Sequence, residues 1–269
     1  TDNQKASKEL EEIRRQNRGI QDEAPLIESS VSMRTVASVI SDWTGIPVPK
    51  LLNRPEEKIK HLNEDLLETI FGQDHACRIV SDRMRMTAAG LHDPQRPLGV
   101  FLLVGPSGVG KTETAKALAD ILFLGGREMI TINMSEFQEA HSIAGLRGAP
   151  PGYVGYGEGG VLTEAVKRTP HNIILLDEFE KAHKDVQEIF FQVFDEGRLD
   201  DSDGERVNFQ NSLILVTSNA GSQIISKYAK QNKFGSSSME LELNNVLNTV
   251  FSPALLGRMN VVPYQTLDE

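Results

Sequence analysis

The sequence has 269 residues, of which 39% are hydrophobic and 25% are charged, a composition typical of a folded globular protein and not of a disordered one. Asp and Glu number 38 against 28 Lys and Arg, and the formal net charge of −10 disfavours a protein that coats nucleic acid through a basic surface. The single cysteine, Cys77, excludes an internal disulfide and a cysteine-based zinc cluster, and no apolar run approaches the roughly 20 residues that cross a bilayer. We expect a soluble, cytoplasmic protein without membrane insertion. Because the first residues carry neither Met nor a signal peptide, we expect a piece of a longer chain.

The first part of the chain predicts a linker and three helices. Residues 1–30 are polar, with charges of both signs, and are typical of a linker. A short amphipathic helix is predicted in the segment before Gly45. Apolar residues recur at helical spacing between Glu56 and Ile70, and a further helix is predicted from about His75 to Ala89, ending at Gly90.

From residue 99 onwards, strands and helices alternate. Short apolar runs predict strands at 99–104, 129–134, 173–176 and 213–219, with an edge strand at 260–264. Between them we predict a helix from Lys111 and a helix over 185–197, which Gly197 is placed to end. The serine-rich segment 233–240 is expected to be a mobile loop. Alternating strands and helices indicate an α/β fold with a parallel, helix-covered sheet.

The strongest motif fits G-x-x-x-x-G-K-[ST] and stands between an apolar strand and a helix, the context that a phosphate-binding loop requires. Its glycines allow backbone N–H groups to surround phosphate oxygens at a helix N-terminus. Lys111 can reach the β- and γ-phosphates, and the Thr112 hydroxyl can ligate Mg²⁺. The alternative is a glycine turn that only joins a strand to a helix. The predicted nucleotide-binding residues are Gly105, Pro106, Ser107, Gly108, Val109, Gly110, Lys111 and Thr112.

An acidic pair follows the strand at 173–176. Asp177 and Glu178 would lie at the carboxyl edge of the sheet, where open α/β sheets bind ligands. Asp177 would hold Mg²⁺, and Glu178 would act as the general base for the water that attacks the γ-phosphorus. The alternative is a solvated Asp-Glu pair at a strand end. The spacing from Lys111 favours hydrolysis of a nucleoside triphosphate.

Two further polar residues are candidates for the same chemistry. Asn219 ends the strand at 213–219 and could orient the attacking water, although Asn is also common as a plain turn residue. Arg258 follows a predicted helix end and could stabilise charge on the γ-phosphoryl group, including from a neighbouring subunit. By itself, Arg258 is one arginine among many.

A glycine-rich loop at 149–157 contains Tyr153 and Tyr156. Large aromatic side chains in a surface loop require an explanation. They could grip an extended polypeptide, or they could fold back and anchor the loop. The spacing does not separate these alternatives.

Together, these residues resemble the AAA+ ATPases, and within them the second ATPase module of the Clp/heat-shock unfoldases. The resemblance covers about residues 35–269, and 1–34 resemble the linker from a preceding module. It is carried by both nucleotide motifs and by DWTGIPV (42–48), FGQDHA (71–76), MSEFQEAHS (134–142), GAPPGYVGYGEGG (148–160), LLDEFEKAH (175–183), DEGRLDD (195–201) and LGRM (256–259). Segments 130–142, 155–166, 188–195 and 253–259 look most like the ClpV branch, the ATPases of bacterial type VI secretion, with the ClpB disaggregases next.

The resemblance implies a three-layer P-loop fold with a five-stranded sheet of order 5-1-4-3-2. It implies ATP and Mg²⁺ as cofactors, adenine contacts from Ile46, Val48 and Phe71, a sensor role for Asn219 and an arginine-finger role for Arg258. It also implies that Tyr153 and Val154 form a pore loop that pulls protein through a homo-hexameric ring, with no nucleic-acid partner.

The substrate implied for a ClpV-like protein is the contracted secretion sheath, in the bacterial cytoplasm. A general disaggregase and an ATP-bound assembly module with little turnover remain alternatives. In the family a helical small subdomain follows this module, and we expect residues 35–269 to correspond to the large subdomain without it.

Overall fold

The computed structural model describes residues 31, 33–44, 48, 55–123, 129–149 and 159–267. The chain divides into two compact units, 1–52 and 53–269. In the first unit the structure describes the helix α2 (Met33–Thr44), which confirms the short helix predicted before Gly45. The second unit contains all the other elements discussed below. The domain boundary expected near residue 35 stays a prediction.

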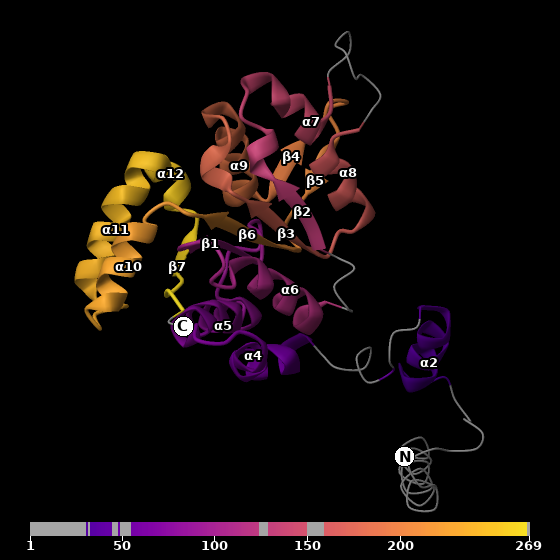
Figure 1. The fold of residues 1–269 in the computed structure, drawn as a ribbon. Helices are drawn as coiled ribbons and strands as arrows, with labels where there is room; N and C mark the ends of the chain where they lie inside the picture. The colour runs from indigo at the N-terminus through magenta and orange to yellow at the C-terminus, as the bar shows by residue number, and fades with distance from the viewer. Residues whose placement is uncertain are drawn as a thin grey trace, which may run out of the picture. The chain divides into compact units, whose positions relative to one another are not determined.

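The second unit is built on a five-stranded parallel sheet (Figure 1). Its strands are β1 (Gly99–Val104), β2 (Met129–Asn133), β3 (Asn172–Asp177), β6 (Ser212–Ser218) and β7 (Asn260–Pro263). They lie in the order β2-β3-β6-β1-β7, and every neighbouring pair is parallel. Numbered one to five along the chain and read from β7, this is the predicted order 5-1-4-3-2. The α/β fold and the edge position of 260–263 are confirmed.

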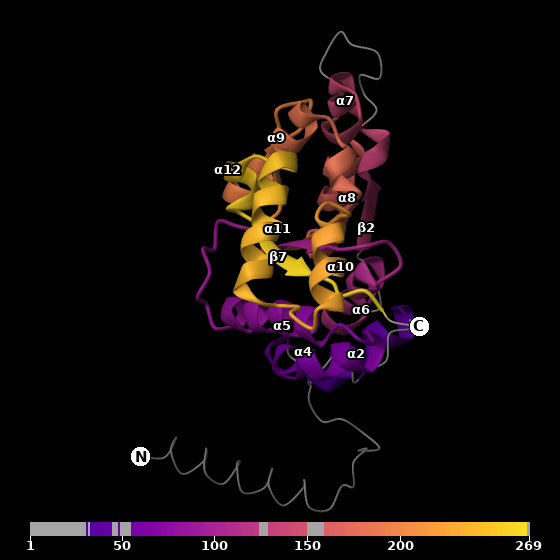
Figure 2. The ribbon, with the colours of Figure 1, turned by 60° about the vertical axis from the view of Figure 1, so that its left-hand side comes forward.

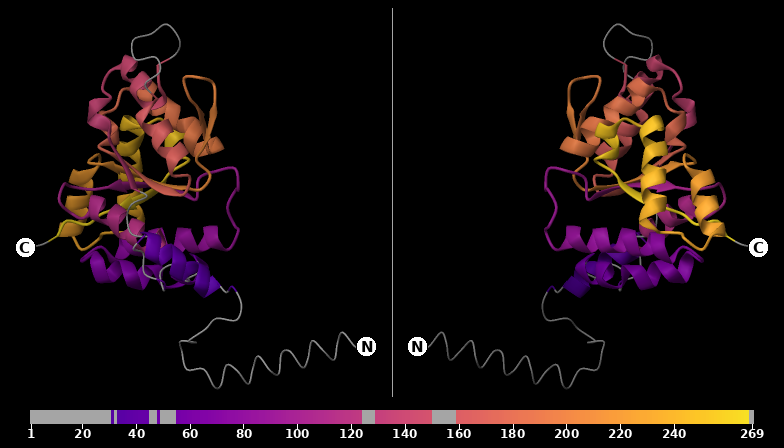
Figure 3. Two further views of the ribbon diagram at one scale, coloured as in Figure 1. Left: turned by 90° about the vertical axis from the view of Figure 1, so that its right-hand side faces the viewer. Right: turned by 90° about the vertical axis from the view of Figure 1, so that its left-hand side faces the viewer.

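Helices cover both faces of this sheet (Figure 3). The first face is covered by α4 (Pro55–Thr69), α5 (Asp74–Ala88) and α6 (Lys111–Leu122). The second is covered by α8 (Val161–Arg168), α9 (Lys184–Glu196), α10 (Ser222–Lys230), α11 (Ser237–Val250) and α12 (Pro253–Leu256). The short helix α7 (Ile143–Arg147) packs against α8. The result is the expected three-layer arrangement.

Alternation along the strands divides the core between the two faces. In β1, Phe101 and Leu103 pack with α4, α5 and α6, whereas Val100, Leu102 and Val104 pack with the helices of the other face. All six residues of β1 are buried. A continuous apolar strand of this kind is typical of a parallel sheet with both faces covered. The polar residues that follow these strands therefore lie at the strand ends, outside the apolar core.

Two segments differ from the sequence prediction. A short antiparallel pair, β4 (Arg198–Asp200) and β5 (Arg206–Asn208), lies outside the main sheet and was not predicted. The serine-rich segment 233–240 is not a loop throughout, because α11 begins at Ser237. The hydroxyl of Ser236 accepts a hydrogen bond from the Met239 N–H and caps this helix, so the serines start a helix there. The helices α10 and α11 then run next to one another (Figure 2).

Among the described residues, no helix has the length and apolar character needed to cross a membrane.

Candidate functional site

The predicted phosphate-binding loop joins β1 to α6. Gly105, Gly108 and Gly110 all have positive φ angles, of 154°, 80° and 99°. A Cβ atom at Gly105 would stand 2.8 Å from the Tyr264 carbonyl oxygen, so this position excludes a side chain. Among the described residues, no side chain caps the start of α6 at Gly110. Its first N–H groups are therefore available to an anion such as phosphate.

The phosphate-binding loop is also anchored to the rest of the unit through Val109. The Val109 side chain is buried in the core of the first face, and its carbonyl accepts a hydrogen bond of 3.1 Å from the buried amide of Gln73. The same amide is bonded to both backbone groups of Gln265, beyond β7. A ligand can therefore contact Val109 only through its backbone. Gln73 belongs to FGQDHA, but its anchoring role was not predicted, because its partners are 36 and 192 residues away.

Lys111 extends across the mouth of this loop. Its ammonium donates to the carbonyls of Gly105 (2.5 Å) and Pro106 (2.8 Å) and to Oδ1 of Asn219 (2.9 Å). Burial lowers the pKa of Lys111, and the nearby carboxylates of Glu180, Asp177 and Glu178 oppose that shift. The three nearby carboxylates favour the charged form of the Lys111 side chain. A phosphate can compete with the present acceptors for the hydrogen bonds that this ammonium donates.

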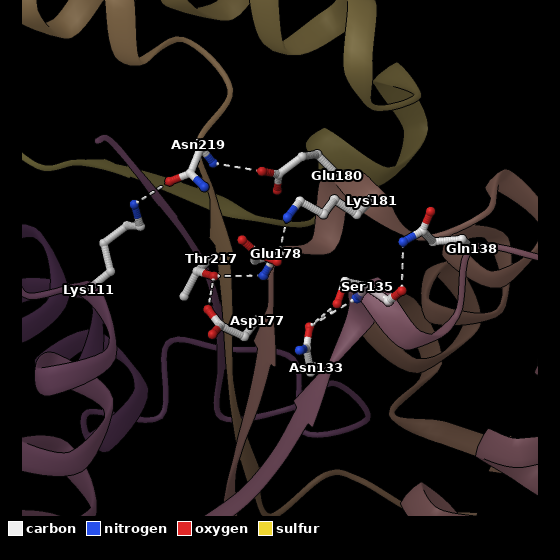
Figure 4. A network of polar contacts seen from close by, with 10 residues as sticks. All are labelled: Lys111, Asn133, Ser135, Gln138, Asp177, Glu178, Glu180, Lys181, Thr217 and Asn219. Atoms are coloured by element: carbon white, nitrogen blue, oxygen red, sulfur yellow. Dashed lines mark hydrogen bonds and ion pairs between the residues drawn. The ribbon is translucent and has the colours of Figure 1, made fainter. Parts of the chain in front are cut away.

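The acidic pair lies at the end of β3, which β6 separates from β1 (Figure 4). Asp177 ends β3, and Glu178 follows it with φ 55° and ψ 45°. The hydroxyl of Thr217, at the end of β6, donates to Oδ1 of Asp177 and accepts from the Glu178 N–H at 3.0 Å. The Glu178 carboxylate pairs with Lys181 at 2.7 Å. The two predicted acids are thus brought next to the loop, as expected.

Asn219 connects the loop to a third acid. Its backbone N–H donates to Oε1 of Glu180 at 3.1 Å, while its side chain accepts from Lys111 (Figure 4). The other carboxylate oxygen, Glu180 Oε2, is buried without a hydrogen-bond partner within the part of the chain that the structure describes. Glu180 was missed because it stands two residues after the stronger Asp-Glu signal. Thr217 was missed because a threonine near a strand end is unremarkable in sequence.

These side chains enclose a cavity of about 390 Å³. This is a common size for a small-molecule site. Its lining residues are Ser107, Gly108, Gly110, Lys111, Thr112, Glu113, Asp177, Glu178, Thr217 and Asn219. A larger cavity of about 580 Å³ lies between α9 and the α11–α12 segment and shares none of these residues.

The donor set of the smaller cavity fits Mg²⁺ with a nucleotide. Thr112 and Asp177 both line it, supplying one hydroxyl and one carboxylate. Mg²⁺ is usually held by one or two such protein groups together with water and substrate phosphates. In the described ranges, no three His, Cys, Asp or Glu side chains gather to form a metal site of their own. The arrangement therefore suits a metal that arrives with phosphates.

Arg258 is not among the described residues that line this cavity. Its Nε donates to Oδ1 of Asp195 at 2.9 Å, and its guanidinium lies over the Phe191 ring, 4.9 Å from the centroid. The hydrogen bond from Arg258, its charge and that of Arg96 hold the pKa of Asp195 below its usual value despite partial burial. The structure thus does not bring Arg258 to the phosphate site of its own chain.

The remaining predicted residues are only partly described. Phe71 is 76% exposed, at the turn between α4 and α5, and its adenine contact stays a prediction. Val48 is half-buried, and its contact is likewise untested. Ile46, Tyr153, Val154 and Tyr156 lie outside the described residues.

Several known proteins are similar in sequence to this chain. A family model described as an AAA domain of the Cdc48 subfamily matches residues 96–262. The chain is 49% identical over 262 residues to a Pseudomonas aeruginosa protein named AAA+ ATPase ClpV1, covering 97% of this chain and 29% of that protein.

Proteins named chaperone protein ClpB are also similar. The Yersinia enterocolitica protein is 44% identical over 273 residues, and the Bacteroides thetaiotaomicron protein 45% over 263 residues. These matches cover 99% and 96% of this chain and 30% of each relative. The chain therefore spans about 30% of the length of the curated relatives it matches. From the matched family and the phosphate-binding loop within it, the chain belongs to the AAA domain family and is an ATPase domain.

Proposed function

We propose that this chain binds Mg–ATP in the 390 Å³ cavity and hydrolyses the γ-phosphate. The observation that carries the proposal is the convergence of Lys111, Asp177, Glu178 and Asn219 on that cavity, from the start of α6 and the ends of β3 and β6. Enzymes catalyse phosphoryl transfer mainly by positioning the reactants and neutralising charge. One lysine, two acids and one amide can position the reactants and, with the metal, neutralise their charge.

Each residue has a distinct proposed task. Lys111 exchanges the loop carbonyls for phosphate oxygens, and Thr112 and Asp177 hold Mg²⁺. The bound metal neutralises negative charge on the phosphates. Glu178 accepts the proton of the attacking water; its Oε2 is paired with Lys181, and its second carboxylate oxygen is the proposed acceptor. Asn219 orients that water through its amide.

Arg258 is proposed to act on another copy of the chain. Among the described residues, Asp195 engages its Nε and Phe191 the face of its guanidinium, and the two terminal nitrogens would approach a γ-phosphate from outside. An arginine supplied in trans is an established way of stabilising this type of transition state.

The test is Glu178→Gln in the native full-length polypeptide. We expect loss of phosphate release with retained nucleotide binding, because the amide keeps the shape of the side chain but cannot accept the proton. Glu68→Gln, on the exposed side of α4, is the matched control and should hydrolyse ATP at the parent rate. Unchanged phosphate release in Glu178→Gln would refute the proposal.

An assembly module with little turnover is a second candidate. The observation that favours it is that Glu178 and Arg258 are both engaged within the chain, by Lys181 and Asp195. In that case nucleotide would drive assembly without measurable phosphate release. Sizing and phosphate release, measured on the same sample, separate the two functions.

For the whole protein we propose an unfoldase or disaggregase motor. The names of the ClpV and ClpB relatives support this function. In this proposal, residues 1–34 are a linker and residues 35–269 are the large nucleotide-binding subdomain. Six copies would form a ring in the bacterial cytoplasm, and Tyr153 and Val154 would contact the threaded protein substrate. Tyr153→Ala should reduce protein unfolding while preserving ATP hydrolysis.

The specific substrate we propose is the contracted type VI secretion sheath. Support comes from the identity of 49% to the protein named ClpV1, against 44% to 46% for proteins named ClpB. The full-length protein should disassemble purified sheaths in the presence of ATP. Reactivation of aggregated enzymes without sheath disassembly would favour the general disaggregase instead.

A further inference from the structure

One buried hydroxyl contacts both residues of the acidic pair. Thr217 is 2% exposed at the end of β6. Its Oγ1 donates to Oδ1 of Asp177 at 2.5 Å and accepts from the Glu178 N–H at 3.0 Å (Figure 4). A hydroxyl has one proton to donate and lone pairs that accept, so it can make both bonds at once.

The position of this hydroxyl follows from how β3 ends. The ladder between β3 and β6 runs in register from Asn172 and Ser212 to Leu176 and Val216. At Glu178 the backbone turns into the left-handed region, and its N–H leaves the ladder. That conformation costs a residue with a side chain on the order of 1 kcal/mol. The Thr217 hydroxyl replaces the lost backbone partner and stabilises the turn.

The same atom sets the direction of the neighbouring carboxylate. With Oδ1 of Asp177 engaged by Thr217, Oδ2 is left for another ligand, and both residues line the phosphate cavity. Partners of this kind orient metal ligands, and their loss typically costs ten- to hundredfold in metal affinity or activity.

We propose that Thr217 is a positioning residue, whose single hydroxyl holds the metal-binding carboxylate of Asp177 and the backbone of the proposed base Glu178 in one fixed arrangement. This inference rests on the proposed ATP hydrolysis. It assigns Thr217 no contact with the reacting atoms.

The experiment compares Thr217→Val and Thr217→Ser in the native full-length polypeptide. Valine keeps the branched shape and removes the hydroxyl, whereas serine keeps the hydroxyl. For Thr217→Val we expect phosphate release to fall about ten- to hundredfold, with more Mg²⁺ needed for half-maximal rate and ADP affinity without Mg²⁺ unchanged. Thr217→Ser should restore most of the rate and the Mg²⁺ dependence.

A matched control is Thr163→Val. Thr163 is 1% exposed in α8, where its hydroxyl donates to the Gly160 carbonyl, and it is not among the described residues that line the cavity. Its variant should hydrolyse ATP at the parent rate. If Thr217→Val does not fold, Thr217→Cys replaces it, because a thiol forms only weak hydrogen bonds. The cysteine variant should then be slower than the serine variant.

Two outcomes separate this inference from the function on which it rests. The positioning role is wrong, and the proposed function stands, if Glu178→Gln abolishes phosphate release while Thr217→Val is as fast as the parent or as Thr217→Ser. The same conclusion applies to Thr217→Cys where it replaces Thr217→Val. If Glu178→Gln releases phosphate at the parent rate, the proposed function itself is wrong.

Discussion

Left-handed backbone conformations at the candidate site have two different origins. Gly108 and Gly110 adopt positive φ angles in open space, where a glycine pays no steric penalty. Glu178 adopts one despite its side chain, with its N–H held by Thr217. Strained residues of this kind concentrate at functional sites. At the scale of single residues, the acid proposed as the base is thus also the one described non-glycine residue lining the cavity that has a positive φ angle.

Cys77 shows how strongly burial controls a single side chain. It lies in α5, 1% exposed, and burial raises the pKa of its thiol to about 11, with a smaller contribution from Asp74. Because the thiolate is the reactive form, we expect Cys77 to resist a disulfide reagent at pH 8 in the folded protein and to react fully in denaturant. The absorbance of the released thiol measures this.

The control for that measurement is Ser238→Cys, on the exposed side of α11, which should react rapidly. The raised pKa of Cys77 also predicts how the free energy of unfolding changes with pH. As pH rises from about 9 to about 11, the unfolded thiol ionises while the buried one stays protonated, so the free energy of unfolding should fall. Reaction of folded Cys77 at the rate of Ser238→Cys would contradict its burial.

The helix α9 illustrates what periodicity predicts and what it omits. Its buried positions Val186, Phe190, Val193 and Phe194 recur at helical spacing, and Gly197 ends it, as predicted, in the left-handed conformation with φ 59°. A Cβ atom at Gly197 would also collide with the Gln95 carbonyl, which precedes β1. The same glycine therefore ends the helix and leaves room for the Gln95 carbonyl, which is distant in sequence.

We expect Gly197→Ala to lower the free energy of unfolding by more than the roughly 1 kcal/mol that the left-handed conformation alone costs. Gly90→Ala is the matched control, because Gly90 also follows a helix with positive φ but has open space around its Cβ position. Denaturant unfolding of both variants isolates the cost of the collision. Equal losses would show that Gln95 moves away freely.

For the whole molecule, the candidate site is assembled where the carboxyl ends of parallel strands meet. β1 and β6 end in register at Val104 and Ser218, so the loop at Gly105 and the residue Asn219 emerge side by side. The two halves of the core on either face of the sheet hold these ends together. A ligand bound across them should therefore stabilise the entire sheet.

We expect Mg–ADP at a hundredfold excess over its Kd to stabilise the folded chain by about 2.7 kcal/mol, since it binds the folded state alone. Thermal unfolding of the 269-residue chain, with and without nucleotide, measures the effect. Lys111→Ala should abolish the shift, whereas Lys230→Ala, at the exposed end of α10, should preserve it. An equal shift in both variants would exclude the loop as the binding site.

Much of the fold and of the candidate site could be predicted from sequence. The strands at β1, β3 and β6 are apolar runs bounded by polar residues, and the phosphate-binding loop has a fixed spacing. The pair β4–β5 was missed because three-residue strands leave no periodic pattern. The start of α11 was missed because serines favour turns and helix caps alike, and only the following apolar residues Met239, Leu243 and Leu247 bury one face.

The sequence by itself determined the residue types of the site, the α/β class and the family resemblance, because these depend on spacing along the chain. Only the tertiary structure decided that Gln73 supports the loop, that Thr217 joins the two acids and that Arg258 is paired with Asp195. Those contacts join residues 36, 40 and 63 positions apart. Such pairs are created by the order and register of the strands and helices, which no local pattern encodes.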